Sequence, residues 1–227
     1  MLINADFSQR VSLLPEQQQW IASPQSGVER IMLDRIGAEK ARATSLVRYA
    51  PHSHFPHHYH PGGEEILVLS GTFSADDTDY PAGWYLRNPP KSGHQPYSDE
   101  GAIIFVKLRQ MRANEQRHVA IDTNDKSSWQ VKDNREICPL FTDSSEQVML
   151  QRLKANEPLF TAPISGGAEI LVLEGELIEE HQVYKRRSWL RLPIDVAPLI
   201  KAGEQGATVY LKINHLSAII GAEVAGV

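Results

Sequence analysis

The sequence predicts an all-β protein with two similar units in tandem, each an antiparallel sandwich or a small β-barrel. The first observation is that short segments rich in β-branched and aromatic residues recur along the 227 residues. The second is that Gly, Pro, Asn and Asp separate these segments, which is typical of antiparallel strands joined by short turns. The third is an internal repeat. Long helical periodicity is absent, and short helices are expected only at residues 15–20 and 111–117.

The internal repeat is clearest in one strand-like segment. Residues 62–71, GGEEILVLSG, match residues 166–175, GGAEILVLEG, at eight of ten positions. The same register continues downstream, where residues 85–89 lie over residues 189–193. After one inserted residue, 100–107 then lie over 205–212. The match therefore covers several successive strands and not a single motif.

The repeat also extends upstream of this segment. Trp20 with residues 28–33 resembles Trp129 with residues 146–150. A match of this length with so few gaps indicates a duplicated domain. We therefore predict two consecutive domains, at residues 1–113 and 114–227.

Composition and charge exclude several classes of protein. The formal net charge is −5 and no basic run exceeds residues 185–187, which argues against a nucleic-acid surface. No apolar stretch approaches the roughly 18 residues that span a bilayer, and the N-terminus lacks the pattern of a signal peptide. Cys138 is the single cysteine, so no internal disulfide can form, and we expect a buried, inert thiol. We expect a cytoplasmic protein that binds neither nucleic acid nor membrane.

A histidine cluster carries the strongest chemical signal. Five of the nine histidines lie within residues 52–60. On a strand, His58 and His60 point to the same face. The turn at residues 61–63 then reverses the chain, so that Glu64 can return a carboxylate to the same point, and His94 follows a later turn and can add a third imidazole. Three imidazoles and one carboxylate suit Zn²⁺ or Fe²⁺ first, with Ni²⁺, Mn²⁺ and Cu²⁺ as alternatives, and suit Ca²⁺ or Mg²⁺ poorly.

The repeat distinguishes Glu64 from its neighbour Glu65. Glu65 has a counterpart, Glu169, in a copy that has lost its histidines, whereas Glu64 is replaced there by Ala168. A carboxylate that disappears together with the histidines is the better ligand candidate. Glu65 is expected to have a structural partner common to both units, and Arg87, which recurs as Arg191, is interpreted as a structural ion-pairing residue.

The remaining polar and aromatic residues near the cluster have structural interpretations. His52, His54 and His57 are expected at the rim or on the surface. Trp84, Tyr85 and Tyr97 are expected to pack in the core and not to line a pocket. No catalytic residue can be assigned from the sequence alone.

The ligand pattern resembles a known family. The spacing from His58 through His60 and Glu64 to Gly71 is similar to the first cupin motif, and the segment from Pro81-x-Gly83 to His94 is similar to the second. Residues 60–65, 85–90 and 105–107 resemble the cupin domain of ChrR, an anti-sigma factor. The resemblance implies two jelly-roll β-barrels in tandem and one divalent ion per chain, bound by the positions of His58, His60, Glu64 and His94.

The resemblance leaves three functional hypotheses open. One is a metalloenzyme of the dioxygenase type that acts on a small organic molecule. The second is a sensor or regulatory module with a protein partner, as in ChrR, although the sequence lacks the His/Cys zinc pattern of the ChrR helical domain that binds the sigma factor. The third is a structural metal site. Small-molecule binding is expected, and a homodimer is compatible with the family.

The second unit is predicted to bind no metal. Non-coordinating residues occupy all four positions that match the ligands, namely Ala162, Ile164, Ala168 and Pro198. An apolar pocket cannot replace the hydration shell of a divalent ion. Scaffold residues such as Gly175 and Pro193 are retained, so we expect this unit to fold around a packed apolar interior.

Overall fold

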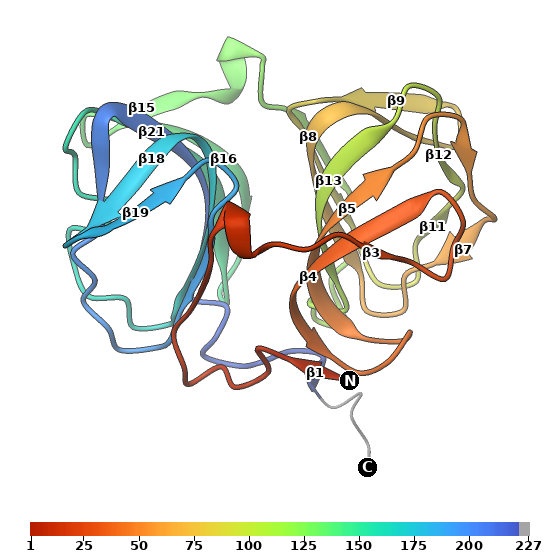
Figure 1. Ribbon diagram of the computed structural model, residues 1–227, viewed down its shortest axis with the longest axis horizontal. Helices are drawn as coiled ribbons and strands as arrows, with labels where there is room; N and C mark the ends of the chain where they lie inside the picture. Colours follow the sequence, from red (N-terminus) through yellow and green to blue (C-terminus); the bar gives the residue numbers. More distant parts are fainter. Residues whose placement is uncertain (223–227) are drawn as a thin grey trace. The chain divides into compact units, whose positions relative to one another are not determined.

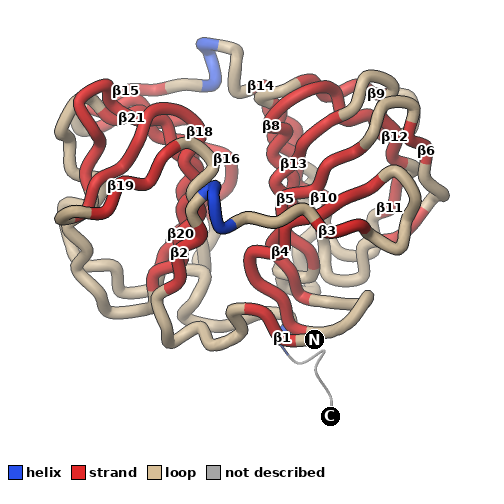
Figure 2. Tube along the Cα trace, in the orientation of Figure 1, coloured by secondary structure: helices blue, strands red, loops and turns tan. Residues whose placement is uncertain are grey.

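The protein is all-β, as the sequence predicts. A computed structural model describes residues 1–222, and it contains antiparallel strands and two short 3₁₀ helices but no α-helix within that range (Figures 1 and 2). The strands form two compact units. Neither sheet closes on itself by hydrogen bonding, so the units are antiparallel sheets and not the closed barrels that we expected. No described helix is long and apolar enough to span a membrane.

The first unit contains residues 1–5 and 19–124, together with the described residues from Ile220. Its main sheet has the strand order β1-β4-β5-β13-β8-β10-β14, and β7 pairs separately with β11. The strands are β1 (Leu2–Ile3), β3 (Ile21–Ala22), β4 (Val28–Ile36), β5 (Arg42–Tyr49), β6 (Ser53–His54), β7 (His58–Tyr59), β8 (Glu64–Ala75), β9 (Thr78–Pro81), β10 (Trp84–Asn88), β11 (Gly93–His94), β12 (Pro96–Ser98), β13 (Ala102–Leu108) and β14 (Val119–Asp122).

The second unit contains residues 6–18 and 125–219. Its sheet has the order β15-β16-β17-β21-β18-β20-β2, with β19 paired to β18. Its strands are β2 (Val11–Leu13), β15 (Gln130–Lys132), β16 (Arg135–Thr142), β17 (Gln147–Leu153), β18 (Ala168–Glu179), β19 (Gln182–Lys185), β20 (Trp189–Leu192) and β21 (Lys201–Ile213), and its 3₁₀ helices are Pro15–Gln17 and Lys126–Ser128.

The two compact units differ from the predicted consecutive domains 1–113 and 114–227. Strand β14 pairs with β10 of the first unit, although it follows residue 113. Strand β2 pairs with β20 of the second unit, although it lies near the N-terminus. Both strands cover the same edge of equivalent sheets. A repeat comparison does not find them because each strand is short and pairs far away in sequence.

The upstream part of the repeat alignment is wrong by one strand. Residues 28–33 lie in β4, whereas 146–150 run into β17, and the strand order places β17 in the position of β5. A repeated interaction gives the correct match. The Arg48 guanidinium lies 4.4 Å from the Trp20 ring and pairs with Glu29, and the Arg152 guanidinium lies 3.8 Å from the Trp129 ring and pairs with Glu136.

The predicted short helices are largely absent. Only Pro15–Gln17 forms a single 3₁₀ turn, while residues 111–117 contain turns and irregular chain. The Glu115 carboxylate accepts hydrogen bonds from the backbone N–H groups of Gln116 and Arg117. Side-chain bonds of this local kind compete with helical backbone bonds.

Alternation along the strands builds each core. In β13 of the first unit, Ile104 and Val106 project from the same face of the strand into the core, where they meet Ile66 and Val68 of β8. The second unit has a larger apolar cluster of the same design, centred on Ile170, Val172 and Val209. Burial of such side chains is the main favourable contribution to folding.

A buried ion pair joins the neighbouring strands β8 and β10, where Glu65 lies directly opposite Arg87. The Glu65 carboxylate and the Arg87 guanidinium are 3.0 Å apart, and their side chains are only 4% and 2% exposed. The structural interpretation of Glu65 and Arg87 is therefore confirmed. Glu169 and Arg191 are buried cross-strand neighbours at the equivalent register in the second unit.

We predict that Glu65→Gln lowers the free energy of unfolding of the first unit by about 3 kcal/mol, because removing one charge of a buried pair leaves the other uncompensated. Chemical denaturation followed by tryptophan fluorescence measures the loss. Glu29→Gln is the matched control, since Glu29 pairs with Arg48 at a more exposed position and should cost less than about 1 kcal/mol. Equal losses in the two variants would contradict the structural role of the buried pair.

Candidate metal centre

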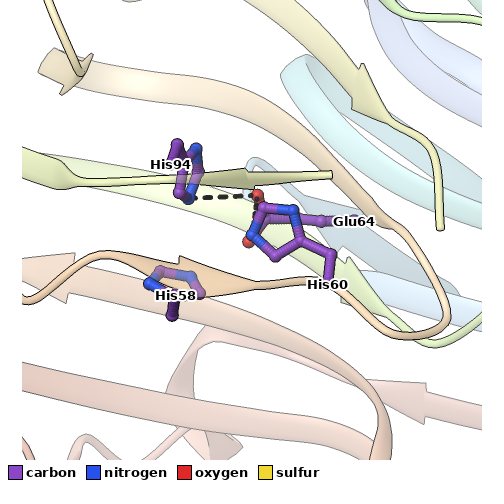
Figure 3. Close-up of side chains that lie close together, drawn as sticks. All are labelled: His58, His60, Glu64 and His94. Atoms are coloured by element: carbon purple, nitrogen blue, oxygen red, sulfur yellow. Dashed lines mark ion pairs between the residues drawn. The ribbon is translucent and has the colours of Figure 1, made fainter. Parts of the chain in front are cut away.

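The structure brings together all four residues predicted as ligands. One nitrogen or oxygen atom from each of His58, His60, Glu64 and His94 lies within 4.8 Å of the others. Figure 3 shows the imidazoles of His60 and His94 close to the Glu64 carboxylate, with dashed lines marking their ion pairs with it, and His58 nearby. This is the one such His/Cys/Asp/Glu group found in residues 1–222.

Two local features of the chain create the cluster. Strand β7 pairs with β11 so that His58 lies directly across from His94. The turn after His60 then leads into β8, which begins with Glu64. Gly63 is in the left-handed region with φ of +78°, and a Cβ at this position would lie 2.4 Å from the Met111 sulfur. A glycine is therefore required where the chain reverses between two ligands.

Two of the distances in the cluster are close to those expected between ligands of one first-row divalent ion. The Glu64 Oε2 atom is 3.4 Å from His60 Nε2 and 3.5 Å from His94 Nε2. Ligands bound at about 2.1 Å are separated from their neighbours by roughly 3.0–3.4 Å. The side chains of His60, Glu64 and His94 are buried, whereas that of His58 is exposed. His60 Nε2 is also buried without a hydrogen-bond partner, as expected of an atom whose lone pair is reserved for a cation.

The hydrogen bonds around His60 fix its tautomer. The Ser92 hydroxyl lies 2.6 Å from the Pro89 carbonyl oxygen, to which it must donate its single hydrogen. Ser92 Oγ therefore accepts at 3.1 Å from the N–H at His60 Nδ1. Nε2 is then the unprotonated nitrogen, and it faces Glu64. A hydrogen-bond acceptor on the far ring nitrogen is the usual way in which proteins orient a metal-binding histidine.

Glu64 and His58 are oriented in the same manner. The Asn88 side-chain amide donates to Glu64 Oε2 at 3.2 Å. His58 Nδ1 lies 3.4 Å from the Pro56 carbonyl oxygen, which leaves Nε2 available to the cluster. The sequence analysis did not identify Asn88 or Ser92 as functional residues.

A signal for Asn88 and Ser92 was present in the repeat. At the offset of 104 residues that relates His60 to Ile164, Asn88 matches Leu192 and Ser92 matches Val196. Both polar residues therefore disappear from the second unit together with the ligands. The backbone contact is kept, since the His60 N–H donates to Ser92 O in the first unit and the Ile164 N–H donates to Val196 O in the second.

Burial shifts the ionisation of the cluster. Burial lowers the pKa of His60 to about 3 and that of His94 to about 4, with additional repulsion from neighbouring histidines, and it also lowers the pKa of His58. The imidazoles are therefore neutral near pH 7, the form that binds metals. Burial raises the pKa of Glu64 to about 7, and the Asn88 hydrogen bond offsets part of this rise.

A cavity opens onto the cluster. It has a volume of about 430 Å³ and is lined by His58, His60 and Glu64 at its inner side. Its walls and mouth are formed by other residues of the same unit: Glu39, Lys40, Val47, Tyr49, Tyr59, Pro61, Ile104, Val106, Leu108 and Arg109. A group of potential ligands beside a cavity can meet a small molecule directly.

The three other histidines near the cluster lie on the surface, as predicted, whereas Trp84 and Tyr97 are only half-buried and do not lie in the core where they were expected. His52, His54 and His57 are exposed, and His54 stacks on Tyr97. Tyr85 is fully buried. Trp84, Tyr85 and Tyr97 are not among the residues that line this cavity. Cys138 is buried, which raises the pKa of its thiol to about 11, so it is inert at neutral pH.

The corresponding interior of the second unit is apolar. Ile164, Ala168 and Leu192 are buried members of its core cluster, and Val196 packs against them. Aliphatic side chains thus fill the positions of His60, Glu64, Asn88 and Ser92. This arrangement offers no ligand atoms for a cation.

The fold and part of the sequence match known proteins. Residues 8–112 match the family model of the ChrR cupin-like domain. A comparison with curated proteins finds no significant match.

Solved structures support the fold assignment. A protein of Nostoc punctiforme described as a dioxygenase candidate has a TM-score of 0.72 and 14% identity over 94% of this chain and 86% of its own. The bacterial pirin YhhW of Escherichia coli, in complex with nickel(II), has a TM-score of 0.65 and 12% identity over 90% of this chain and 98% of its own. A cupin 2 conserved barrel domain protein of Leptotrichia buccalis has a TM-score of 0.59 and 13% identity over 86% and 92%. At these identities the likeness concerns the fold alone.

We predict that His58→Ala, His60→Ala, Glu64→Gln and His94→Ala each lower metal affinity by more than about tenfold, because each removes an atom that faces the same point. Elemental analysis after dialysis against a weak chelator measures the content, and the wild type should retain one ion per chain. His52→Ala is the matched control and should retain the same content. Two ions per chain, with one surviving the double loss of His58 and His60, would place a second site elsewhere.

We predict that metal affinity rises with pH up to about 7 and then levels off. Glu64 with a pKa of about 7 must lose a proton to bind a cation, whereas the buried imidazoles are neutral down to about pH 4. Below pH 7 the affinity should therefore fall by about tenfold per pH unit. Competition with a chelator at several pH values measures the slope. In Glu64→Gln the affinity should be weaker and should depend less steeply on pH below 7 than in the wild type; an unchanged slope would exclude Glu64 as the titrating ligand.

Proposed function

We propose that this chain, whose residues 8–112 match the family model of the ChrR cupin-like domain, is a metal-dependent enzyme of the dioxygenase type that acts on a small organic molecule. His58, His60, Glu64 and His94 would hold one divalent ion, Fe²⁺ for oxygen chemistry. The observation that carries the proposal is the cavity of about 430 Å³ that opens onto three of these side chains. A purely structural metal site is closed by protein ligands, whereas a catalytic one keeps open positions.

The surrounding residues would prepare the site. Ser92 and the Pro56 carbonyl hold two imidazoles in the tautomer that directs Nε2 to the cluster, and Asn88 holds the carboxylate. When bound, the ion supplies Lewis acidity and, as iron, redox chemistry toward O₂. Four protein ligands would leave coordination positions of such an ion open to other molecules. The exposed side of His58 lies at the cavity, where such molecules would arrive.

The likeness to other proteins supports this proposal at the level of the fold. One similar structure is described as a dioxygenase candidate, and another binds nickel(II). A second candidate function is a sensor or regulatory module, in which the same cavity detects a ligand or reactive species. The match to the ChrR cupin-like domain favours that alternative.

We predict that the metal-free protein, reconstituted with Fe²⁺ under anaerobic conditions, consumes O₂ with at least one small diketone, thiol or phenol, because the redox-active ion would face the cavity. The Zn²⁺ form should not consume O₂. An oxygen electrode measures the rates, and His60→Ala loaded with Fe²⁺ is the matched control for iron in solution. Failure of every metal form over a broad panel, with a specific regulatory protein recovered by pull-down, would favour the sensor function.

A further inference from the structure

The cavity beside the metal centre has an apolar wall and a cationic mouth. Val47 and Tyr49 project from one face of β5, and Ile104, Val106 and Leu108 project from one face of β13. The two strands are hydrogen-bonded neighbours, with Val47 directly opposite Ile104. These side chains therefore form one continuous surface that can contact the carbon skeleton of a ligand.

The mouth contains two cations, Lys40 and Arg109. Neither side chain makes an ion pair or a side-chain hydrogen bond with the part of the chain that the structure describes. Glu39, the acidic residue at the mouth, is paired with Arg30 at 3.4 Å. The backbone N–H of Arg109 donates to the Gly63 carbonyl at 3.0 Å, which ties Arg109 to the turn between His60 and Glu64.

The charge of the centre favours an anion as well. A divalent ion with three neutral imidazoles and one carboxylate has a net charge of about +1. The protein as a whole has a formal net charge of −5, yet this cavity combines a positive centre with two cations that pair with no side chain of residues 1–222. An anionic ligand would neutralise both features.

Tyr49 supplies a polar group on the apolar wall. Its ring contacts Phe55 and Phe73 edge to face, with centroids 5.0 and 5.8 Å apart, and these contacts fix its position. Its hydroxyl makes no hydrogen bond within residues 1–222, and the residue lines the cavity with Glu64. Burial, and then the nearby Glu64 carboxylate, raise the pKa of the Tyr49 hydroxyl far above its usual range, so it remains a hydrogen-bond donor.

From this geometry we propose that the substrate is a small carboxylate that carries a further oxygen-containing group, such as a ketone. Its carboxylate lies between Lys40 and Arg109, and its carbon skeleton lies on the β5–β13 wall. The oxygen of the further group accepts a hydrogen bond from Tyr49. This proposal rests on the proposed function and specifies its substrate class. Lys40 and Arg109 select for the charge, while Tyr49 positions the oxygen function near the metal centre.

The test uses the Zn²⁺-loaded full chain, which consumes no O₂, and 5-oxohexanoate as the probe. Isothermal titration calorimetry should show saturable binding at millimolar or lower concentrations. Lys40→Gln and Arg109→Gln should each lower the affinity for 5-oxohexanoate about fivefold, since each removes one partly exposed charge contact. The neutral 5-oxohexanamide should bind equally to these variants and the wild type. Lys132→Gln, an exposed charge change in the second unit, is the matched control and should have no effect.

Tyr49→Phe should also lower the affinity for 5-oxohexanoate about fivefold, which is the typical effect of losing one neutral hydrogen bond. It should leave the affinity for hexanoate, which lacks the keto oxygen, unchanged. Metal content and thermal unfolding, measured first for every variant, identify any change that acts through folding or metal loss. Absence of saturable binding by the wild type, or equal effects on the charged and neutral probes, would overturn the proposal. Selective binding by the Zn²⁺ form, together with an Fe²⁺ form that consumes no O₂, would retain this ligand class and reject the oxygenase function.

Discussion

A buried carboxylate beside two buried imidazoles is the constraint on which the candidate site of the first unit depends. Removing such polar groups from water is unfavourable unless they find partners. In this cluster burial favours the neutral form of each group: the pKa of Glu64 rises to about 7, and those of His60 and His94 fall to about 3 and 4. A divalent cation would bind the carboxylate and the unprotonated nitrogens at the same time. It would therefore offset the cost of burying this group in an otherwise apolar interior.

The second unit shows what the same scaffold does without that constraint. It keeps the strand order, the turn glycines and the buried Glu169 and Arg191. In place of His60, Glu64, Asn88 and Ser92 it has aliphatic side chains that belong to one large core cluster or pack against it. The fold is therefore held by strand pairing, apolar burial and buried ionic contacts, and the metal-binding group is an addition to the first unit only.

The cavity connects the buried cluster with chemistry. Its inner surface contains the candidate ligands, its wall is apolar, and its mouth has Lys40 and Arg109. The candidate ligands at the cavity lie on β7, on β8 and between these two strands, the apolar wall lies on β5 and β13, and the two cations follow β4 and β13. A small molecule in this space would meet the metal centre, an apolar surface and positive charge at once. This combination favours binding and catalysis over a purely structural role for the ion.

The sequence by itself determined the fold class, the repeat and the candidate ligands. These depend on local spacing: His58 and His60 are two residues apart in an extended segment, a glycine turn leads to Glu64, and the loss of the same positions in the second copy distinguishes Glu64 from Glu65. Only the tertiary structure decided which strands complete each unit, because β2 and β14 pair with partners distant in sequence. It also revealed Ser92, Asn88 and Tyr49 around the cluster. Their roles depend on where a side chain lies after the sheet has formed, and pairing between distant strands sets that position, not the spacing along the chain.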